Sequence, residues 1–242
     1  MALVRPGDTE RPTWAVYQHE YYLGTVHARP DGDGLWHVQC ANEQRASLDD
    51  AVRVLRRPPV WLRQRQQAAR WAGAVLADPA LLVIDIQTAG LGDQAWAVQI
   101  AAIDGGGRIV VNQLLDPRRP ITAAASALHG ITRADVAHAP CFADVLPHLT
   151  GVLDGRRCVA YNVSFDRGVM TREVLRHHGT APLTGSWLDR VRWEDAMGPV
   201  AVAEGLWSVD RCQYRRQRLG GRYDAVDKCR VLLRRLHHLA LA

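Results

Sequence analysis

Two side chains with oxygen donors, Asp85 and Gln87, stand at the end of an apolar run that begins at Leu81. Short apolar runs closed by a glycine-containing turn, here Thr88-Ala89-Gly90, are typical of buried strands. Because strand side chains alternate between two faces, Asp85 and Gln87 share one face, while Ile86 points into a core. Two carboxylates so placed can hold Mg²⁺ against a scissile phosphate. The amide of Gln87 lacks the second negative charge that this chemistry requires.

Further candidate residues lie downstream at two strand-to-helix or loop-to-helix junctions. Asn162, Phe165 and Asp166 follow a predicted strand over 157–161 and enter a predicted helix that reaches about residue 178. Tyr223 and Lys228 lie where the last predicted helix, 224–241, begins. Lys228 is the only lysine of a chain that otherwise uses arginine.

The elements that must position these residues form a predicted domain over 79–242. Strands are expected at 81–84, 95–103 and 108–115, where short links favour an antiparallel meander. Helices are expected at about 143–153, 162–178, 191–204 and 224–241. This pattern predicts an α/β domain with a mixed β-sheet flanked by helices. Residues 1–76 are predicted to form a small β-hairpin-plus-helix appendage, with Ser47 capping its first helix. The appendage is expected to be a packing module or lid, or else a contact for a protein partner or nucleic acid.

Composition limits the class of protein. The 242 residues are 48% hydrophobic and 23% charged, an ordinary globular balance. The sequence contains no apolar run of the roughly 20 residues that a membrane span needs, and the N-terminal residues lack a signal-peptide core. We therefore expect a cytoplasmic location and no membrane partner. Five cysteines without a C-x-x-C pair favour reduced thiols.

The net charge of +5 and the pI of about 9.2 are compatible with nucleic-acid binding. Arg215, Arg216 and Arg218 belong to an arginine-rich stretch near the C-terminus. Guanidinium groups suit phosphate recognition, so these arginines are candidate phosphate contacts. A solvated basic loop is the alternative.

The ordered motifs resemble the DEDD-type (DEDDh-like) 3′-5′ exonucleases of the ribonuclease H-like superfamily. The resemblance runs from about Leu81 to Leu239 and rests on four motifs: Asp85-x-Gln87-Thr88, Leu128-His129-Gly130-Ile131-Thr132, Asn162-x-x-Phe165-Asp166 and Tyr223-Asp224-Ala225-Val226-Asp227-Lys228. It implies a ribonuclease H-like exonuclease fold. The N-terminal appendage resembles one found on actinobacterial exonuclease-like proteins.

The family's chemistry uses four acids that hold two divalent cations, and a histidine that takes a proton from the attacking water. By this resemblance Asp85 and Asp166 match two acids, whereas Gln87 stands at a glutamate position. Tyr223 stands at the histidine and Lys228 at the last acid. The formal charge of the four ligand positions is therefore −1, against about −4 in the family. Tyrosine is also a poor base at neutral pH.

The resemblance also places Thr88 and Phe165 near a terminal nucleotide, with His129 at the family's turn histidine. Asn162 orients a nucleotide or simply caps its helix. We therefore expect a protein that binds single-stranded nucleic acid or a nucleotide, needs no cofactor, and has lost all or most catalysis. One hypothesis is that Lys228 lies between Asp85 and Asp166 as a built-in cation.

Three alternatives stay open. Sliding the last motif by one residue would put Arg222 at the histidine position and Asp227 at the acid. The protein would then be an active exonuclease whose Mg²⁺ or Mn²⁺ is held by Asp85, Asp166 and Asp227. The second alternative is a repurposed enzyme that uses Tyr223 and Lys228. The third is an interaction or scaffold protein.

Overall fold

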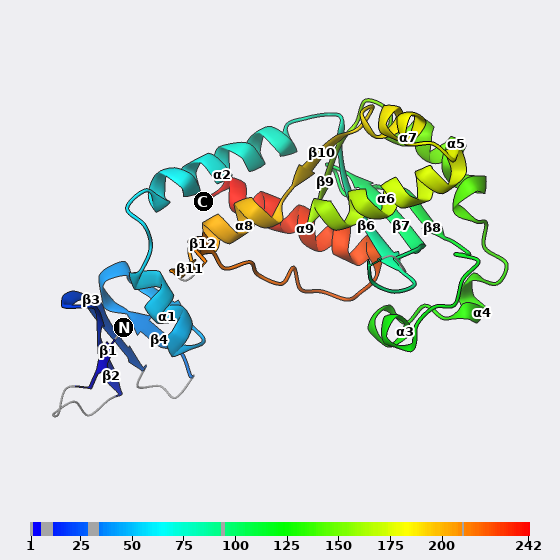
Figure 1. Ribbon diagram of the computed structural model, residues 1–242. Coiled ribbons are helices and arrows are strands. Elements are labelled where there is room, and N and C mark those ends of the chain that lie inside the picture. The colour runs from blue at the N-terminus through cyan, green and yellow to red at the C-terminus, as the bar shows by residue number, and fades with distance from the viewer. Residues whose placement is uncertain (1, 6–11, 29–33, 93–94, 210) are drawn as a thin grey trace. The chain divides into compact units, whose positions relative to one another are not determined.

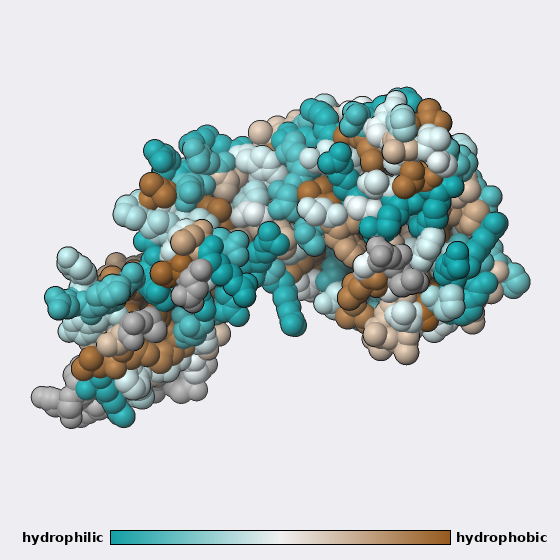
Figure 2. All heavy atoms as spheres, in the orientation of Figure 1, coloured by the Kyte–Doolittle hydropathy of each residue, from teal (hydrophilic) through white to brown (hydrophobic). Residues whose placement is uncertain are grey.

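The computed structural model describes residues 2–5, 12–28, 34–92, 95–209 and 211–242 (Figure 1). The chain divides into two compact units, one made of residues 1–67 and 201–216, the other of residues 68–200 and 217–242. Each unit has its own hydrophobic core. Hydrophilic side chains cover much of the face shown in Figure 2, as the mean hydropathy of −0.17 suggests.

The second unit is built on a mixed five-stranded sheet with the order β10-β9-β6-β7-β8. Strands β6, β9 and β10 are parallel, and β7 and β8 continue the sheet antiparallel. The strands are β6 (Leu81–Thr88), β7 (Ala97–Asp104), β8 (Ile109–Leu114), β9 (Arg157–Ala160) and β10 (Arg192–Asp195). A mixed sheet flanked by helices confirms the predicted α/β class.

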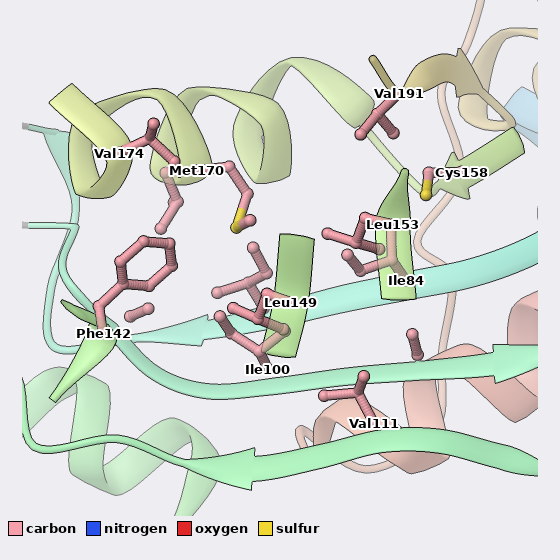
Figure 3. Packing of buried hydrophobic residues seen from close by; sticks show 14 of the residues in the cluster. Ile84, Ile100, Val111, Phe142, Leu149, Leu153, Cys158, Met170, Val174 and Val191 are labelled. Carbon is pink, nitrogen blue, oxygen red and sulfur yellow. The ribbon is translucent and has the colours of Figure 1, made fainter. Parts of the chain in front are cut away.

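Helices cover both faces of this sheet: α5 (Phe142–Leu153), α6 (Val163–His178) and α7 (Ala181–Leu188) on one face, and α9 (Ala225–Ala240) on the other. The helices α3 (Ala123–His129) and α4 (Arg133–Val136) lie in the connection from β8 to α5, and α8 (Met197–Glu204) follows β10. Leu82, Ile84 and Ile86 of β6 pack with α5, α6 and α7, a core seen from close by in Figure 3. Leu81 and Val83 point to the opposite face and pack with α9. Strand β6 is therefore apolar on both faces until Asp85, as a central strand must be.

Residues 192–195 correct one expectation, because the predicted helix over 191–204 begins only at Met197. The preceding residues form β10, which pairs in parallel with β9. Glu194 of β10 accepts hydrogen bonds from Arg157 Nε at 2.7 Å and from Trp71 Nε1 at 2.7 Å. The open edge of β9 and these two side-chain bonds outweigh the local helix preference.

The first unit is larger than the expected hairpin with helices. It contains a five-stranded antiparallel sheet in the order β1-β2-β3-β4-β5, followed by α1. Its elements are β1 (Ala2–Val4), β2 (Thr13–Gln18), β3 (Tyr21–Ala28), β4 (Trp36–Val38), a short 3₁₀ turn (Gln39–Ala41), β5 (Glu43–Arg45), α1 (Leu48–Leu55), the start of α2 (Trp61–Leu76), and the hairpin β11 (Trp207–Ser208) and β12 (Gln213–Tyr214). Ser47 caps α1 as predicted, its side chain accepting from Asp50 N at 3.1 Å.

The unit boundaries differ from the predicted boundary near residue 76 because residues 201–216 pack with the N-terminal segment. Leu206 lies in the same core as Val16, Val26 and Val38. Trp61 Nε1 donates to the carbonyl of Val202 at 2.8 Å. Contacts so distant in sequence leave no local signal. None of the helices in the described part of the chain is both long and apolar enough to cross a membrane.

Candidate active-site cleft

Strand β6 presents the first two site residues toward the α9 side of the sheet. Asp85 pairs in register with Ala101 of β7, which belongs to the core under α9. The Gln87 side chain is buried, and its Nε2 donates to Asp85 Oδ2 at 2.6 Å. The amide thus supplies a hydrogen bond to the carboxylate where a second acid would have repelled it.

Helix α6 brings the second carboxylate to the same place. Asn162 precedes the helix in a left-handed conformation, and Asp195 Oδ1 accepts from the backbone N–H groups of Asn162 and Val163 at 3.1 and 3.0 Å. Asp166 then lies in the first turn and is buried, at 3% exposure. Its Oδ1 accepts from Ile86 N at 3.0 Å, which ties α6 to β6 beside Asp85.

The N-terminus of α9 positions Lys228. Asp224 caps the helix, accepting from Asp227 N at 3.0 Å and from Gln99 Nε2 at 3.0 Å. Gln99 in turn accepts from Ala225 N at 3.1 Å, so β7 fixes the rotation of the helix. As a result Lys228 is buried, with its Nζ donating to the carbonyl of Gly220 at 2.8 Å and lying 4.0 Å from the centre of the Tyr223 ring.

Asp227 points away from Lys228, as adjacent helix positions must. Its side chain is 37% exposed and lies 3.7 Å from Arg230. It is not among the residues that line the cleft. The slid register would therefore require a rotation of α9 that the Asp224 and Gln99 bonds oppose.

These elements enclose a cleft of about 550 Å³. It brings together nine of the predicted residues: Asp85, Gln87, Thr88, His129, Asn162, Phe165, Asp166, Tyr223 and Lys228. Further lining residues that sequence reasoning did not assign are Leu91, Thr122, Ala124, Ala125, Leu128 and Tyr161. Most of these residues are small or apolar and carry no chemical signature, although Leu128 and Tyr161 adjoin predicted site residues.

The predicted arginines are not part of the cleft. Arg215 and Arg216 belong to the first unit, and Arg218 is an exposed residue of the second unit that does not line the cleft. His129 lines the cleft, but both of its ring nitrogens bond to the backbone. Nδ1 accepts from Ile131 N at 3.0 Å, so Nε2 carries the proton and donates to the Thr88 carbonyl at 3.1 Å. His129 therefore fastens α3 to the end of β6.

Burial governs the protonation of the two carboxylates. It raises the pKa of Asp85 to about 7, against the opposing effects of the Gln87 hydrogen bond and the Lys228 charge. Burial, followed by repulsion from Asp85, raises the pKa of Asp166 well above its ordinary value. Burial also lowers the pKa of Lys228, while the charge of Asp85 opposes that shift. The charges of Lys228 and Asp85 therefore attract each other.

The ammonium does not bridge the carboxylates directly. Within the described part of the chain Lys228 forms no ion pair with Asp85 or Asp166, and its Nζ bonds to Gly220 instead. The structure therefore does not show the ammonium clamped between both acids, although the charge of Asp85 opposes the lowering of the Lys228 pKa.

The donor set does not fit a pair of divalent cations. Such a pair needs several anionic oxygen ligands, whereas this cleft offers Asp85 and Asp166 beside an ammonium. No group of three or more histidine, cysteine, aspartate or glutamate side chains that could hold a metal occurs among the residues described. The cleft combines apolar wall residues with hydrogen-bonding carboxyl groups and one positive charge.

Comparison with known proteins gives this cleft a context. A family model described as "Exonuclease" (RNase_T) matches residues 82–194, a range that includes Asp85 and Asp166 but ends before Tyr223 and Lys228. An uncharacterized exonuclease, CP81, of Escherichia phage 186 is 39% identical over 101 residues, covering 42% of this chain and 50% of that protein. Exodeoxyribonuclease 10 of Escherichia coli K12 is 44% identical over 93 residues, covering 37% of this chain and 40% of that protein.

The chain thus spans about half or less of the length of these curated relatives. Among solved structures, exonuclease X in complex with 5′ overhanging duplex DNA shares 30% sequence identity. That match covers 65% of this chain and 89% of the other, with a TM-score of 0.42.

Proposed function

The chain belongs to the exonuclease family through residues 82–194, and from this premise we propose that its cleft binds the 3′ end of a nucleic acid strand, or a nucleotide, with hydrolysis lost or strongly reduced. The proposal depends on one observation, the position of Lys228. Its buried ammonium lies in the same cleft as Asp85 and Asp166, where the family's chemistry would need an anion.

Charge supports the loss of hydrolysis. A single positive charge about 6 Å from a divalent cation, at an effective dielectric constant of about 40, raises the cation's energy by about 3 kcal/mol. Such a penalty lowers metal affinity about 100-fold. Gln87 adds to the effect, because its amide is neutral and its Nε2 already bonds to Asp85.

The missing base supports the same conclusion. Tyr223 occupies the position before α9 at which the family has a histidine, and this residue is 42% exposed where it lines the cleft. A phenol is protonated at neutral pH and does not readily take a proton from water. His129 cannot substitute, because both of its nitrogens are engaged by the backbone.

The walls of the cleft support binding. Leu91 and Leu128 are exposed apolar side chains, and Phe165 lies with them along the cleft. Apolar surfaces of this kind can pack against a base or sugar, while the polar floor orients it. The names of the relatives are consistent with such a ligand, since one is an exodeoxyribonuclease and one was solved with duplex DNA.

The experiment that tests this proposal measures binding and digestion together. Fluorescent single-stranded DNA and RNA, labelled at the 5′ end, are incubated with the protein and Mn²⁺, and anisotropy and product length are recorded. We expect binding that a 3′-terminal phosphate alters, without release of nucleotides. Metal-dependent shortening from the 3′ end that disappears in Asp85→Ala would instead establish an active exonuclease.

A further inference from the structure

The first unit contains a basic pocket of about 460 Å³, formed entirely from its own residues. Its walls come from α1 and from the β11–β12 hairpin, which contacts α1 (Figure 1). Four arginines line it: Arg53, Arg211, Arg215 and Arg216. We call this concavity the arginine pocket.

The hairpin that carries three of these arginines is firmly anchored. Trp207 and Tyr214 pair across the hairpin edge to face, with ring centroids 5.0 Å apart. Tyr214 donates from its hydroxyl to Gln64 at 2.5 Å, and Arg215 N donates to the carbonyl of the buried Leu206 at 2.7 Å. The pocket therefore rests on the core of the first unit.

Two carboxylates of α1 hold two of the guanidinium groups in place. Arg53 Nε lies 2.9 Å from Asp49, and Arg215 Nη1 lies 2.7 Å from Asp50. Arg211 and Arg216 are exposed and form no ion pair with any described residue. The formal charge of the group is positive, since four arginines face two aspartates. Arg53 and Arg215, which the aspartates hold in place, lose little side-chain freedom when they bind an anion.

We propose that the arginine pocket binds the phosphodiester backbone of a nucleic acid, at a site separate from the cleft. Guanidinium groups match phosphate oxygens with paired hydrogen bonds. The remaining lining residues, Asp49, Ser208 and Gln213, are polar, so nothing in the pocket would stack on a base or insert into a membrane. This lining favours a polymer's phosphates over a free nucleotide, which needs a base site, and over a lipid, which needs apolar contacts.

The test is the salt dependence of binding to an oligothymidylate, measured with the whole chain. Each phosphate contact on a single strand contributes about 0.7 to the slope of log affinity against log salt concentration. The double variant Arg211→Gln/Arg216→Gln should lower this slope by about 1.4. Between about 50 and about 200 mM salt, the affinity of the wild type should then fall about 7-fold more than that of the variant.

The control is Arg70→Gln/Arg234→Gln, which removes the same charge from exposed positions outside the pocket and should leave the slope within about 0.3 of the wild type. Equal slopes for the two double variants would overturn the proposal. So would a pocket-dependent attachment to phosphatidylserine vesicles without any change in oligothymidylate binding, or equally strong competition by inorganic phosphate.

This test is independent of the cleft. A cleft variant such as Phe165→Ala should change discrimination between 3′-hydroxyl and 3′-phosphate ends while the salt slope persists. The arginine-pocket variant should lower the slope for both kinds of end and keep their discrimination. Failure of the cleft proposal would therefore leave the pocket result intact, and the reverse also holds.

Discussion

Replacing Lys228 with aspartate should give the cleft a measurable affinity for divalent cations. The change removes a buried ammonium that interacts with the charge of Asp85, and it places a third carboxylate in the cleft beside Asp85 and Asp166. At about 6 Å and an effective dielectric constant of about 40, removing the positive charge is worth about 3 kcal/mol to a bound Mn²⁺ ion. Adding the negative charge contributes a similar amount. Because three crowded carboxylates repel one another, part of this gain is lost as instability of the metal-free protein.

The net expectation is an increase in Mn²⁺ affinity of at least about 100-fold, which corresponds to about 3 kcal/mol. Isothermal titration calorimetry gives the affinity directly, and a rise in melting temperature with Mn²⁺ gives an independent measure. The matched control is Arg234→Asp, which makes the same charge change at an exposed position of α9 outside the cleft. If the two variants bind Mn²⁺ equally, the Lys228 charge is not what keeps divalent ions out, and the reasoning fails.

Four further outcomes are expected. Adding Gln87→Glu and Tyr223→His to the Lys228 change should produce Mn²⁺-dependent release of nucleotides from a 3′ end, which gel analysis would detect. The folded protein keeps a proton on Asp85 up to a pH of about 7, whereas the unfolded chain releases it near pH 4. This group should therefore lower the free energy of unfolding as the pH rises from about 4 to about 7, by at most about 4 kcal/mol. Asp85→Asn should flatten that decline in urea titrations, and an unchanged slope would contradict the assigned shift. Asp224→Ala removes the cap of α9 and its bond to Gln99, and should cost about 1 to 2 kcal/mol by denaturant titration, whereas Asp227→Ala should cost less than about 0.5 kcal/mol. Leu149→Ala in the α5 core should cost about 2 to 5 kcal/mol with cleft binding retained, and a smaller loss would mean that the core relaxes around the deletion.

The amino-acid sequence by itself determined the central strand, the last helix and the shared face of Asp85 and Gln87. These features depend on local periodicity, since side chains alternate along a strand and repeat every 3.6 residues along a helix. The same periodicity predicted that Asp227 and Lys228 point in different directions from the helix, although it could not say which of them faces the cleft. The prediction that Asp166 joins Asp85 came from the resemblance to the exonuclease family, because the two residues lie on elements far apart in the chain, β6 and α6.

Only the tertiary structure decided the rest. Gln99 and Asp224 fix the rotation of α9, which puts Lys228 inside, and Gly220 receives its ammonium. The edge of β9 turns residues 192–195 into a strand. Packing of Leu206 into the N-terminal core gathers arginines from distant segments into one pocket. In each case the partner lies far away in sequence, and such contacts take shape only when hydrophobic burial compensates for the entropy of closing the intervening chain.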